Sequence, residues 1–302
     1  MNKPTIALLI PLYPPHFKRA DALLDSVHQH MLNEQADVYF VFSNETEAAS
    51  YSKKVKKIIL PEDLRLQNNK GIINIKKFYG LRYLGESYNY IIVLDAESQF
   101  VRNCNLEKIC KSFFRKKEIY GNTPILDVAQ IQKSCKRFFE DSQRNLLDSY
   151  DELYFWFNQP CIYSSANLKS FFSVTHILDQ MGQLCYFDFD YYIYIYYLIL
   201  YEGFKVVDLQ AWAPCGLCES YAFIQKYGSD ISKFYPAVCN PRIYTQINNE
   251  SVVLFIQLNA GVREDDDIIS YGKSREFFSF VSSSIASLRR KLFFFIKKLW
   301  LR

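Results

Sequence analysis

The sequence lacks any long uninterrupted hydrophobic segment. Nowhere in its 302 residues do about 18 apolar residues follow one another, the length that a membrane-spanning helix needs. The first apolar run ends at Pro11, too early for the hydrophobic region of a signal peptide. We therefore expect neither a spanning helix nor a cleaved leader.

Residues that build common cofactor sites are also scarce. The chain has 10 glycines, and no G-x-G-x-x-G motif follows the first predicted strand, which argues against a dinucleotide-binding turn. Its four histidines form no metal-ligand motif. Cys215 and Cys218 form a lone C-x-x-C without a second pair at zinc spacing. Because the eight cysteines are scattered, we expect reduced, buried or incidental thiols in a cytoplasmic protein.

What the chain does contain is typical of a globular protein. Apolar residues make up 49% and charged residues 23%. The net charge of +4 has its source in the last fourteen residues, which carry six Lys and Arg and no acid. The remainder is therefore slightly acidic, and we expect no nucleic-acid partner.

Alternating strands and helices predict an α/β fold with a mostly parallel central sheet. Hydrophobic patterning predicts strands over residues 5–10, 37–42, 57–60, 90–95, 159–163, 205–209 and 252–258. It predicts helices over residues 17–32, 73–84, 105–114, 134–147, 165–172 and 187–201. Most of residues 212–249 receive no assignment. We expect one domain over residues 1–270, with parts of about 1–100 and 101–270, followed by a tail over 271–302.

The stretch Tyr90–Ser98 ends a buried strand in two carboxylates, Asp95 and Glu97. In open α/β sheets, ligands bind just beyond the carboxyl ends of the strands. Two carboxylates one residue apart at such a position can share a hard divalent cation that also holds phosphates. The alternative is an acidic strand end that only caps the next turn.

The order of these features resembles the nucleotide-sugar glycosyltransferases of the GT-A fold. The first predicted strand ends in Ile10-Pro11-Leu12-Tyr13, the second ends in polar residues, and a helix leads to the strand that ends in Asp95-Ala96-Glu97. The resemblance covers about residues 4–100 and returns near 186–209. It implies a GT-A-like, Rossmann-type sandwich. The family usually has Asp-x-Asp where this chain has Asp-x-Glu, which keeps the charge but reaches further.

Carried onto this sequence, the resemblance implies a nucleotide site at the strand ends. Asp95 would contact the ribose or a divalent metal, Mn²⁺ or Mg²⁺, and Glu97 would hold that metal against the diphosphate. Lys76, Lys77 and Arg82 would be cations near the phosphates, with a solvated helix surface as the alternative for each. The residues implied to flank the nucleoside are Pro11, Leu12, Tyr13, Ser43, Asn44 and Glu45.

Asp188 and Asp190 lie in a strongly aromatic segment, where a carboxylate is costly unless it caps a helix, pairs or faces a cavity. In inverting members of the family, an acidic residue at the start of this helix deprotonates the acceptor hydroxyl. The resemblance therefore assigns the base to Asp190, with Asp188 second. The alternative is that these residues cap the helix, and a retaining mechanism then becomes open.

An aromatic segment between the two acidic sites is a candidate acceptor pocket. Aromatic faces pack against sugar C–H surfaces, and amides read hydroxyls. The candidate residues are Trp156, Asn158 and Gln159. Packing within the core is the alternative for this segment.

The tail over residues 277–302 combines aromatic clusters with cations and contains no acid. Such a segment is typical of an amphipathic helix that lies on an anionic membrane surface. The alternative is a terminal helix docked on the domain. We prefer the membrane because cations without acids are attracted to anionic lipids.

Together these features favour a bacterial-type glycosyltransferase on the inner face of the plasma membrane. It would move a sugar from a nucleotide-diphosphate donor, UDP-sugar favoured, to a glycan or lipid-linked acceptor in surface polysaccharide or lipooligosaccharide assembly. Two alternatives stay open. One is a sugar-phosphate nucleotidyltransferase, although the loop after the first strand lacks its glycines. The other is a noncatalytic glycan- or membrane-binding partner protein.

Overall fold

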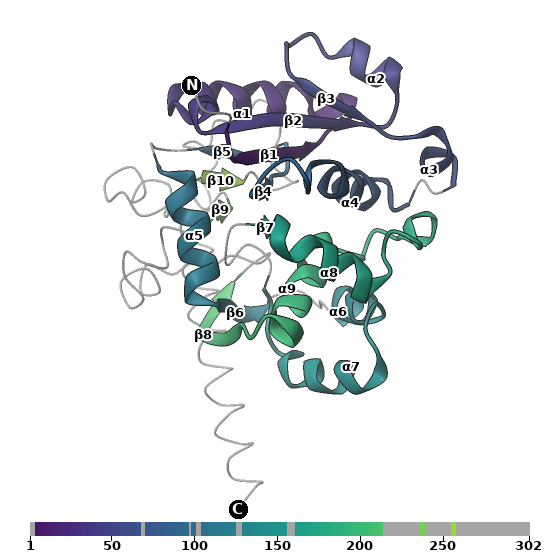
Figure 1. The fold of residues 1–302 in the computed structure, drawn as a ribbon, viewed down its shortest axis with the longest axis vertical. Helices are drawn as coiled ribbons and strands as arrows, with labels where there is room; N and C mark the ends of the chain where they lie inside the picture. The colour runs from purple at the N-terminus through teal and green to yellow at the C-terminus, as the bar shows by residue number, and fades with distance from the viewer. Residues whose placement is uncertain are drawn as a thin grey trace, which may run out of the picture.

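The computed structural model describes residues 4–67, 70–96, 98–100, 104–124, 129–155, 161–213, 236–238 and 255–257. Its central sheet has the strand order β3-β2-β1-β4-β7 (Figure 1). The first four of these strands run parallel, and β7 runs antiparallel to β4. The prediction of an α/β fold with a mostly parallel sheet is confirmed. The strands of this sheet are β1 (Ile6–Pro11), β2 (Ala36–Phe42), β3 (Lys56–Ile59), β4 (Tyr90–Val93) and β7 (Ile162–Ser164).

The sheet is buried because its inner strands are hydrophobic on both faces. Every residue of β1 is buried, as expected for a parallel strand covered on two sides. Helix α4 (Ile72–Leu84) packs on β1, and Gly80 makes this close approach possible. A Cβ at Gly80 would lie 2.6 Å from a methyl carbon of Leu9, so a larger residue here would require the buried Leu9 side chain to move.

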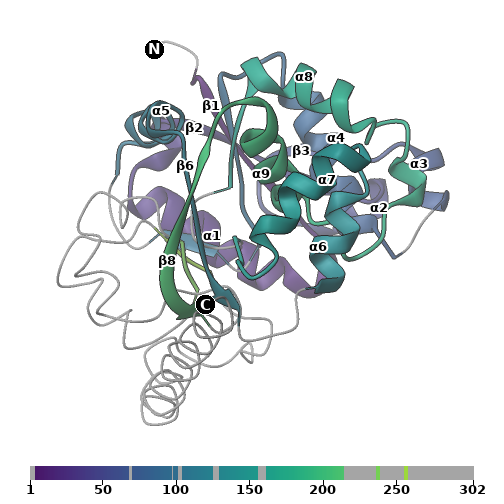
Figure 2. The ribbon, with the colours of Figure 1, turned by 90° about the horizontal axis from the view of Figure 1, so that it is seen from below.

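The remaining helices and strands complete the domain around this sheet. Figure 1 shows α8 and α9 near β7, below the parallel strands, and Figure 2 shows β6 and β8 running side by side. Strands β6 and β8 pair in parallel, and β5, β10 and β9 form a small separate sheet. The helices are α1 (Phe17–Gln29), α2 (Glu45–Ser50), α3 (Glu62–Gln67), α5 (Leu106–Lys116), α6 (Ala129–Lys136), α7 (Asp141–Leu147), α8 (Ser165–Thr175) and α9 (Asp190–Tyr201). The strands outside the central sheet are β5 (Ser98–Phe100), β6 (Glu118–Pro124), β8 (Lys205–Ala213), β9 (Pro236–Val238) and β10 (Phe255–Gln257).

Helix α9 is rich in tyrosine and deeply buried. All its residues from Asp190 to Leu198 are buried, so protein encloses this part of the helix on every side. Its tyrosine hydroxyls meet backbone groups: those of Tyr192 and Tyr194 accept hydrogen bonds from the backbone N–H groups of Phe155 and Ser164. These contacts satisfy polar groups that would otherwise be buried without partners. The tyrosines are therefore core residues here.

The structure departs from the predicted elements at several places. Residues 134–147, predicted as one helix, include the end of α6 and all of α7, because a capping box at Glu140 and Gln143 begins a new helix. Strand β6 was not predicted, since its sequence EIYGNTP contains weak strand formers. Helices α2 and α3 were also not predicted. The predicted strand over 252–258 includes β10, and α9 begins three residues later than expected.

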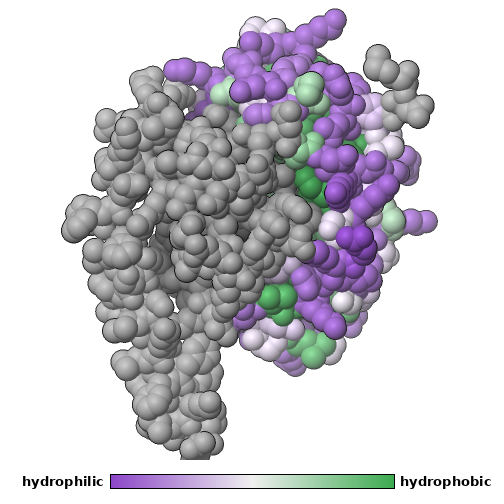
Figure 3. Space-filling view, turned by 90° about the vertical axis from the view of Figure 1, so that its left-hand side faces the viewer, coloured by the Kyte–Doolittle hydropathy of each residue, from purple (hydrophilic) through white to green (hydrophobic). Residues whose placement is uncertain are grey.

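The described surface in Figure 3 is mostly hydrophilic, with small separate hydrophobic patches. In the part of the chain that the structure describes, none of the helices is both long and apolar enough to cross a bilayer. The predicted tail over residues 271–302 lies outside the described residues.

Candidate functional site

Two sets of polar side chains gather beyond the carboxyl ends of the parallel strands. Because β1, β2 and β4 run in the same direction, the residues that follow them meet at one edge of the sheet. Helix α4 runs beside this edge and contributes two consecutive lysines, Lys76 and Lys77. Each lysine belongs to a different set.

The first set, which we call the Lys77 cluster, consists of Lys77, Asp95, Asp190 and Tyr163. The Lys77 ammonium lies 3.2 Å from a carboxylate oxygen of Asp95 and 3.1 Å from one of Asp190. The second oxygen of Asp190 accepts a hydrogen bond of 2.6 Å from the Tyr163 hydroxyl. Asp95 follows β4, Asp190 begins α9 and Tyr163 lies in β7. Four elements far apart in sequence thus converge on one ammonium and two carboxylates.

Burial differs across the Lys77 cluster. The side chain of Asp190 is 4% exposed, whereas that of Asp95 is 21% exposed. The cluster therefore reaches the surface on its Asp95 side. Asp190 is the first residue of α9, directly after the N-cap residue Phe189, so its charge complements the helix dipole. Its carboxylate also contacts Lys77 and Tyr163.

The electrostatics of the cluster keep Lys77 charged and Tyr163 neutral. Burial lowers the pKa of Lys77, but the charges of Asp190 and then Asp95 outweigh it and raise this pKa above its ordinary value. Burial, followed by the charge of Asp190, raises the pKa of Tyr163 well above its ordinary value. The same two causes raise the pKa of the nearby Cys161 thiol. Lys77 is thus a permanent cation at neutral pH, and Tyr163 stays a hydrogen-bond donor.

The second set, which we call the strand-end cluster, joins the residues after β1 and β2. The Lys76 ammonium donates to the backbone oxygen of Leu12 at 2.5 Å and lies 3.5 Å from the Glu47 carboxylate. The same Glu47 oxygen accepts the backbone N–H of Ser43 at 2.8 Å. Asn44 caps α2 by accepting the Glu47 backbone N–H at 2.8 Å. Predicted nucleoside-binding residues from two strand ends are therefore connected through Lys76 and Glu47.

The burial of the two lysines excludes the solvated alternative for both. Lys76 is 2% exposed and Lys77 is 9% exposed, whereas an ordinary helix-surface lysine extends into water. Burial lowers the pKa of Lys76, although the Glu47 carboxylate opposes this effect. Arg82, the third predicted cation on α4, is exposed. Consecutive residues on a helix point in different directions, which is why Lys76 and Lys77 belong to different clusters.

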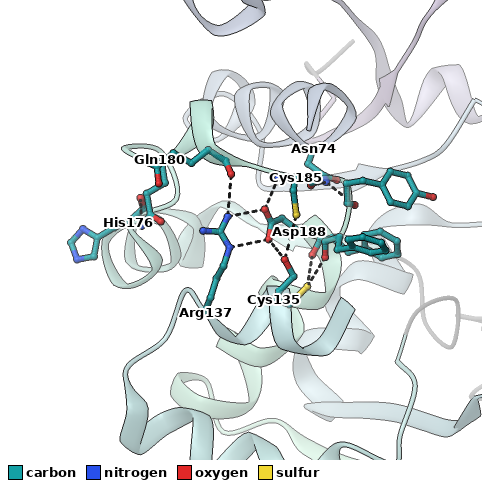
Figure 4. A network of polar contacts seen from close by, with 12 residues as sticks. Asn74, Cys135, Arg137, His176, Gln180, Cys185 and Asp188 are labelled. Atoms are coloured by element: carbon teal, nitrogen blue, oxygen red, sulfur yellow. Dashed lines mark hydrogen bonds and ion pairs between the residues drawn. The ribbon is translucent and has the colours of Figure 1, made fainter. Parts of the chain in front are cut away.

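A third network surrounds Asp188 and is drawn in Figure 4. One Asp188 oxygen accepts the Ser134 hydroxyl at 2.6 Å and Arg137 Nε at 3.1 Å. The other accepts Arg137 Nη2 at 2.8 Å and the Cys185 backbone N–H at 2.7 Å. Asp188 is fully buried. Nearby, the Asn74 side chain of α4 donates to the backbone oxygen of Cys185 at 2.8 Å.

These contacts give Asp188 a different setting from Asp190. Burial raises the pKa of Asp188, but hydrogen bonds from Arg137, Ser134 and the Cys185 backbone outweigh it and lower the pKa below its ordinary value. Four donors occupy the two oxygens, so the carboxylate holds α6 against the segment that precedes α9. Sequence reasoning ranked Asp188 as the second candidate base, and its contacts are those of a residue that anchors the chain.

Several predicted site residues lie elsewhere or outside the described residues. Glu45 is exposed on α2, and Pro11 is the last residue of β1. Tyr13 is 38% exposed, and its hydroxyl lies 2.7 Å from the His16 ring nitrogen Nε2. The predicted residues that lie outside the described ones are Glu97, Trp156, Asn158, Gln159, Cys215 and Cys218.

Tyr163 and Glu47 were not singled out from the sequence. Glu47 had a usable signal, because Asn44-x-x-Glu47 has the spacing of a helix N-terminus. Tyr163 had none, since a tyrosine at the end of a predicted strand is ordinary. Only the packing of β7 against α9 brings its hydroxyl to Asp190.

Of the two predicted metal ligands, the described residues include Asp95. Among them, no group of three or more His, Cys, Asp or Glu side chains is placed to hold a metal ion. Asp95 provides one partly exposed carboxylate, and its predicted co-ligand Glu97 lies outside the described residues. Oxygen ligands of this kind suit Mn²⁺ or Mg²⁺, which usually complete their coordination with substrate phosphates and water.

Comparison with known proteins leaves the family open. The chain matches no known protein-family profile, and it has no significantly similar sequence among curated proteins.

Proposed function

We propose that this chain is a nucleotide-sugar-dependent glycosyltransferase with a GT-A-like sandwich fold. The observation that carries the proposal is the Lys77 ammonium, which joins Asp95 at the end of β4 to Asp190 at the start of α9. These are the predicted donor-side and acceptor-side carboxylates, and they meet at the ligand-binding edge of a mostly parallel sheet. Buried charged groups that converge at such an edge favour a functional site.

On the donor side, the proposal assigns the nucleoside to the strand-end cluster and the diphosphate to the Asp95 side of the Lys77 cluster. Leu12, Tyr13, Ser43 and Asn44 would flank the nucleoside. Asp95, with Glu97, would hold a divalent metal, Mn²⁺ or Mg²⁺, which when bound supplies positive charge for the departing nucleoside diphosphate. Lys77 adds a fixed cation at the same place and needs no reorganisation during the reaction.

On the acceptor side, Asp190 is the proposed base of an inverting reaction. The acceptor hydroxyl would transfer its proton to Asp190 while its oxygen attacks the anomeric carbon. The bond from that carbon to the phosphate oxygen breaks, and the nucleoside diphosphate leaves with the bonding electron pair. Asp190 is assigned this role because it begins α9 beside the Lys77 ammonium, which also contacts the donor-side carboxylate of Asp95.

Nucleotide binding tests the donor side. Calorimetry with UDP, GDP and CMP, with and without Mn²⁺, should show metal-dependent binding of one nucleotide, with UDP favoured. Asp95→Ala should abolish this binding. The matched control is Asp179→Ala, because the Asp179 side chain is 81% exposed and lies apart from the site. Absence of binding to all three nucleotides, or equal binding by both variants, would count against the proposal.

Transfer to an acceptor tests the base. Asp190→Asn keeps the size of the side chain but removes its ability to take up a proton. The variant should bind the donor nucleotide as the wild type does, and it should release free nucleoside diphosphate at the background rate. Near-normal transfer by Asp190→Asn would remove this assignment and leave the retaining mechanism as the alternative.

Membrane contact by residues 277–302 forms a separate part of the proposal and rests on sequence alone. The segment would attach the enzyme to an anionic membrane surface, where a lipid-linked acceptor resides. Deletion of these residues should release the protein from vesicles that contain anionic lipids, as measured by co-sedimentation. Continued binding by the truncated protein would contradict this part and leave the catalytic part unchanged.

A further inference from the structure

Tyr163 stands out among the buried polar side chains because its hydroxyl touches a proposed catalytic group. It lies in β7, where it pairs with Ile91 of β4, and it is fully buried. The hydroxyl donates to Asp190 at 2.6 Å. The proposed reaction assigns no chemical step to this hydroxyl.

The ring of Tyr163 is fixed by its neighbours on α9. Its centroid lies 4.4 Å from that of Tyr194 and 5.8 Å from that of Tyr191. Close packing against two neighbouring rings leaves a buried aromatic ring little freedom to change rotamer. The hydroxyl is therefore held at one point relative to the first turn of α9.

An ammonium and a hydroxyl each contact one oxygen of the Asp190 carboxylate. Lys77 lies against one oxygen and Tyr163 donates to the other. A carboxylate anchored at both oxygens cannot rotate about its own axis, so its remaining lone pairs keep a constant direction. Because the pKa of Tyr163 is raised by burial, the hydroxyl keeps its proton and continues to donate.

From this geometry we infer that Tyr163 is a positioning residue, which orients the Asp190 carboxylate toward the acceptor hydroxyl. The inference rests on the proposed transferase function and adds to it a residue that acts through Asp190. Tyr163 does not itself touch substrate. A base held in one orientation reacts faster than a rotating one, because small misplacements of a reacting group cost large factors in rate.

The test is Tyr163→Phe, which removes only the hydroxyl. The variant should bind the donor nucleotide with a Kd within about twofold of wild type, while its kcat should fall about 10- to 100-fold. Tyr194→Phe is the matched control: it removes an equally buried hydroxyl from the ring next to Tyr163, and that hydroxyl contacts the Ser164 backbone. The control should keep kcat within about threefold of wild type at similar thermal stability.

A double-mutant cycle separates positioning from general support of the fold. In chemical denaturation, Tyr163→Phe and Asp190→Asn should show a combined loss of stability smaller than the sum of the two single losses, because Tyr163→Phe removes the hydrogen bond that Asp190→Asn weakens by removing the charge. The losses of stability caused by Tyr194→Phe and Asp190→Asn should be additive.

The possible results separate failure of this inference from failure of the transferase proposal. Equal kcat values for Tyr163→Phe and Tyr194→Phe in an active enzyme would overturn the role of Tyr163 alone. So would additive stability losses for Tyr163 and Asp190. A wild-type chain that binds no nucleotide and transfers no sugar would overturn the proposed function, and this role for Tyr163 with it.

Discussion

Replacement of Asp188 by Asn should destabilise the protein strongly, although it changes one oxygen to an NH₂ group. The amide can keep one acceptor oxygen, so the donors at the other oxygen lose their partner. These are Arg137 Nη2 at 2.8 Å and the Cys185 backbone N–H at 2.7 Å. A hydrogen bond to a charged group contributes about 1.5–3 kcal/mol, and a buried donor without an acceptor costs about 1–3 kcal/mol.

The free energy of unfolding should fall by about 3 kcal/mol in total, at the lower end of the range for breaking a buried ion pair. The lower end applies because the Arg137 side chain is 35% exposed and recovers some hydration when its partner is lost. In a protein of this size, such a loss corresponds to a decrease in Tm of roughly 6 °C.

The pH dependence of this loss follows from the lowered pKa of Asp188. A carboxyl group with a pKa lower in the folded than in the unfolded state contributes stability above its unfolded pKa, about 3.9 for Asp. That contribution disappears as the pH falls through the folded pKa. Urea denaturation at several pH values should therefore show that the free energies of unfolding of wild type and Asp188→Asn differ by a constant amount from pH 7 to 5. This difference should narrow below about pH 4.

Asp179→Asn is the control, because its side chain is 81% exposed and its replacement should change stability by less than about 0.5 kcal/mol. If Asp188→Asn and Asp179→Asn unfold at the same urea concentration at pH 7, the four-donor account of Asp188 is refuted. A difference that stays constant down to pH 3 would refute the ionic part of the argument.

Two further predictions concern α4. Gly80→Ala should destabilise by about 1–3 kcal/mol despite the higher helix propensity of Ala, because the new Cβ would lie 2.6 Å from a methyl carbon of the buried Leu9; increased stability in thermal unfolding would contradict this packing. Lys77→Met should cost about 3–5 kcal/mol, since it leaves two carboxylates without their shared cation. Lys76→Met should destabilise less, because one carboxylate among the described residues lies within 4 Å of this ammonium; equal losses in urea denaturation would contradict the division between the two clusters.

The order of strands and helices in the first hundred residues was predictable because it depends on local pattern. Short unbroken apolar runs such as Ile6–Pro11 are typical of buried strands in a parallel sheet, and the polar residues after such strands are expected at one edge. The later part was less predictable. Strand β6 forms from a sequence with Gly121 and Pro124, because its pairing with β8 outweighs weak local preference.

The site divides in the same way. From the sequence, Asp95 was a candidate because it follows a buried strand, and the resemblance to GT-A glycosyltransferases added Lys77 and Asp190. The sequence could not show that one ammonium joins the two carboxylates, or that Asp188 has Arg137 as its partner while Asp190 has Tyr163. These pairings depend on distances between segments that lie far apart along the chain. Local residue type determined which groups carry charge, and only the packing of α4, α6, β7 and α9 decided which of those charges meet.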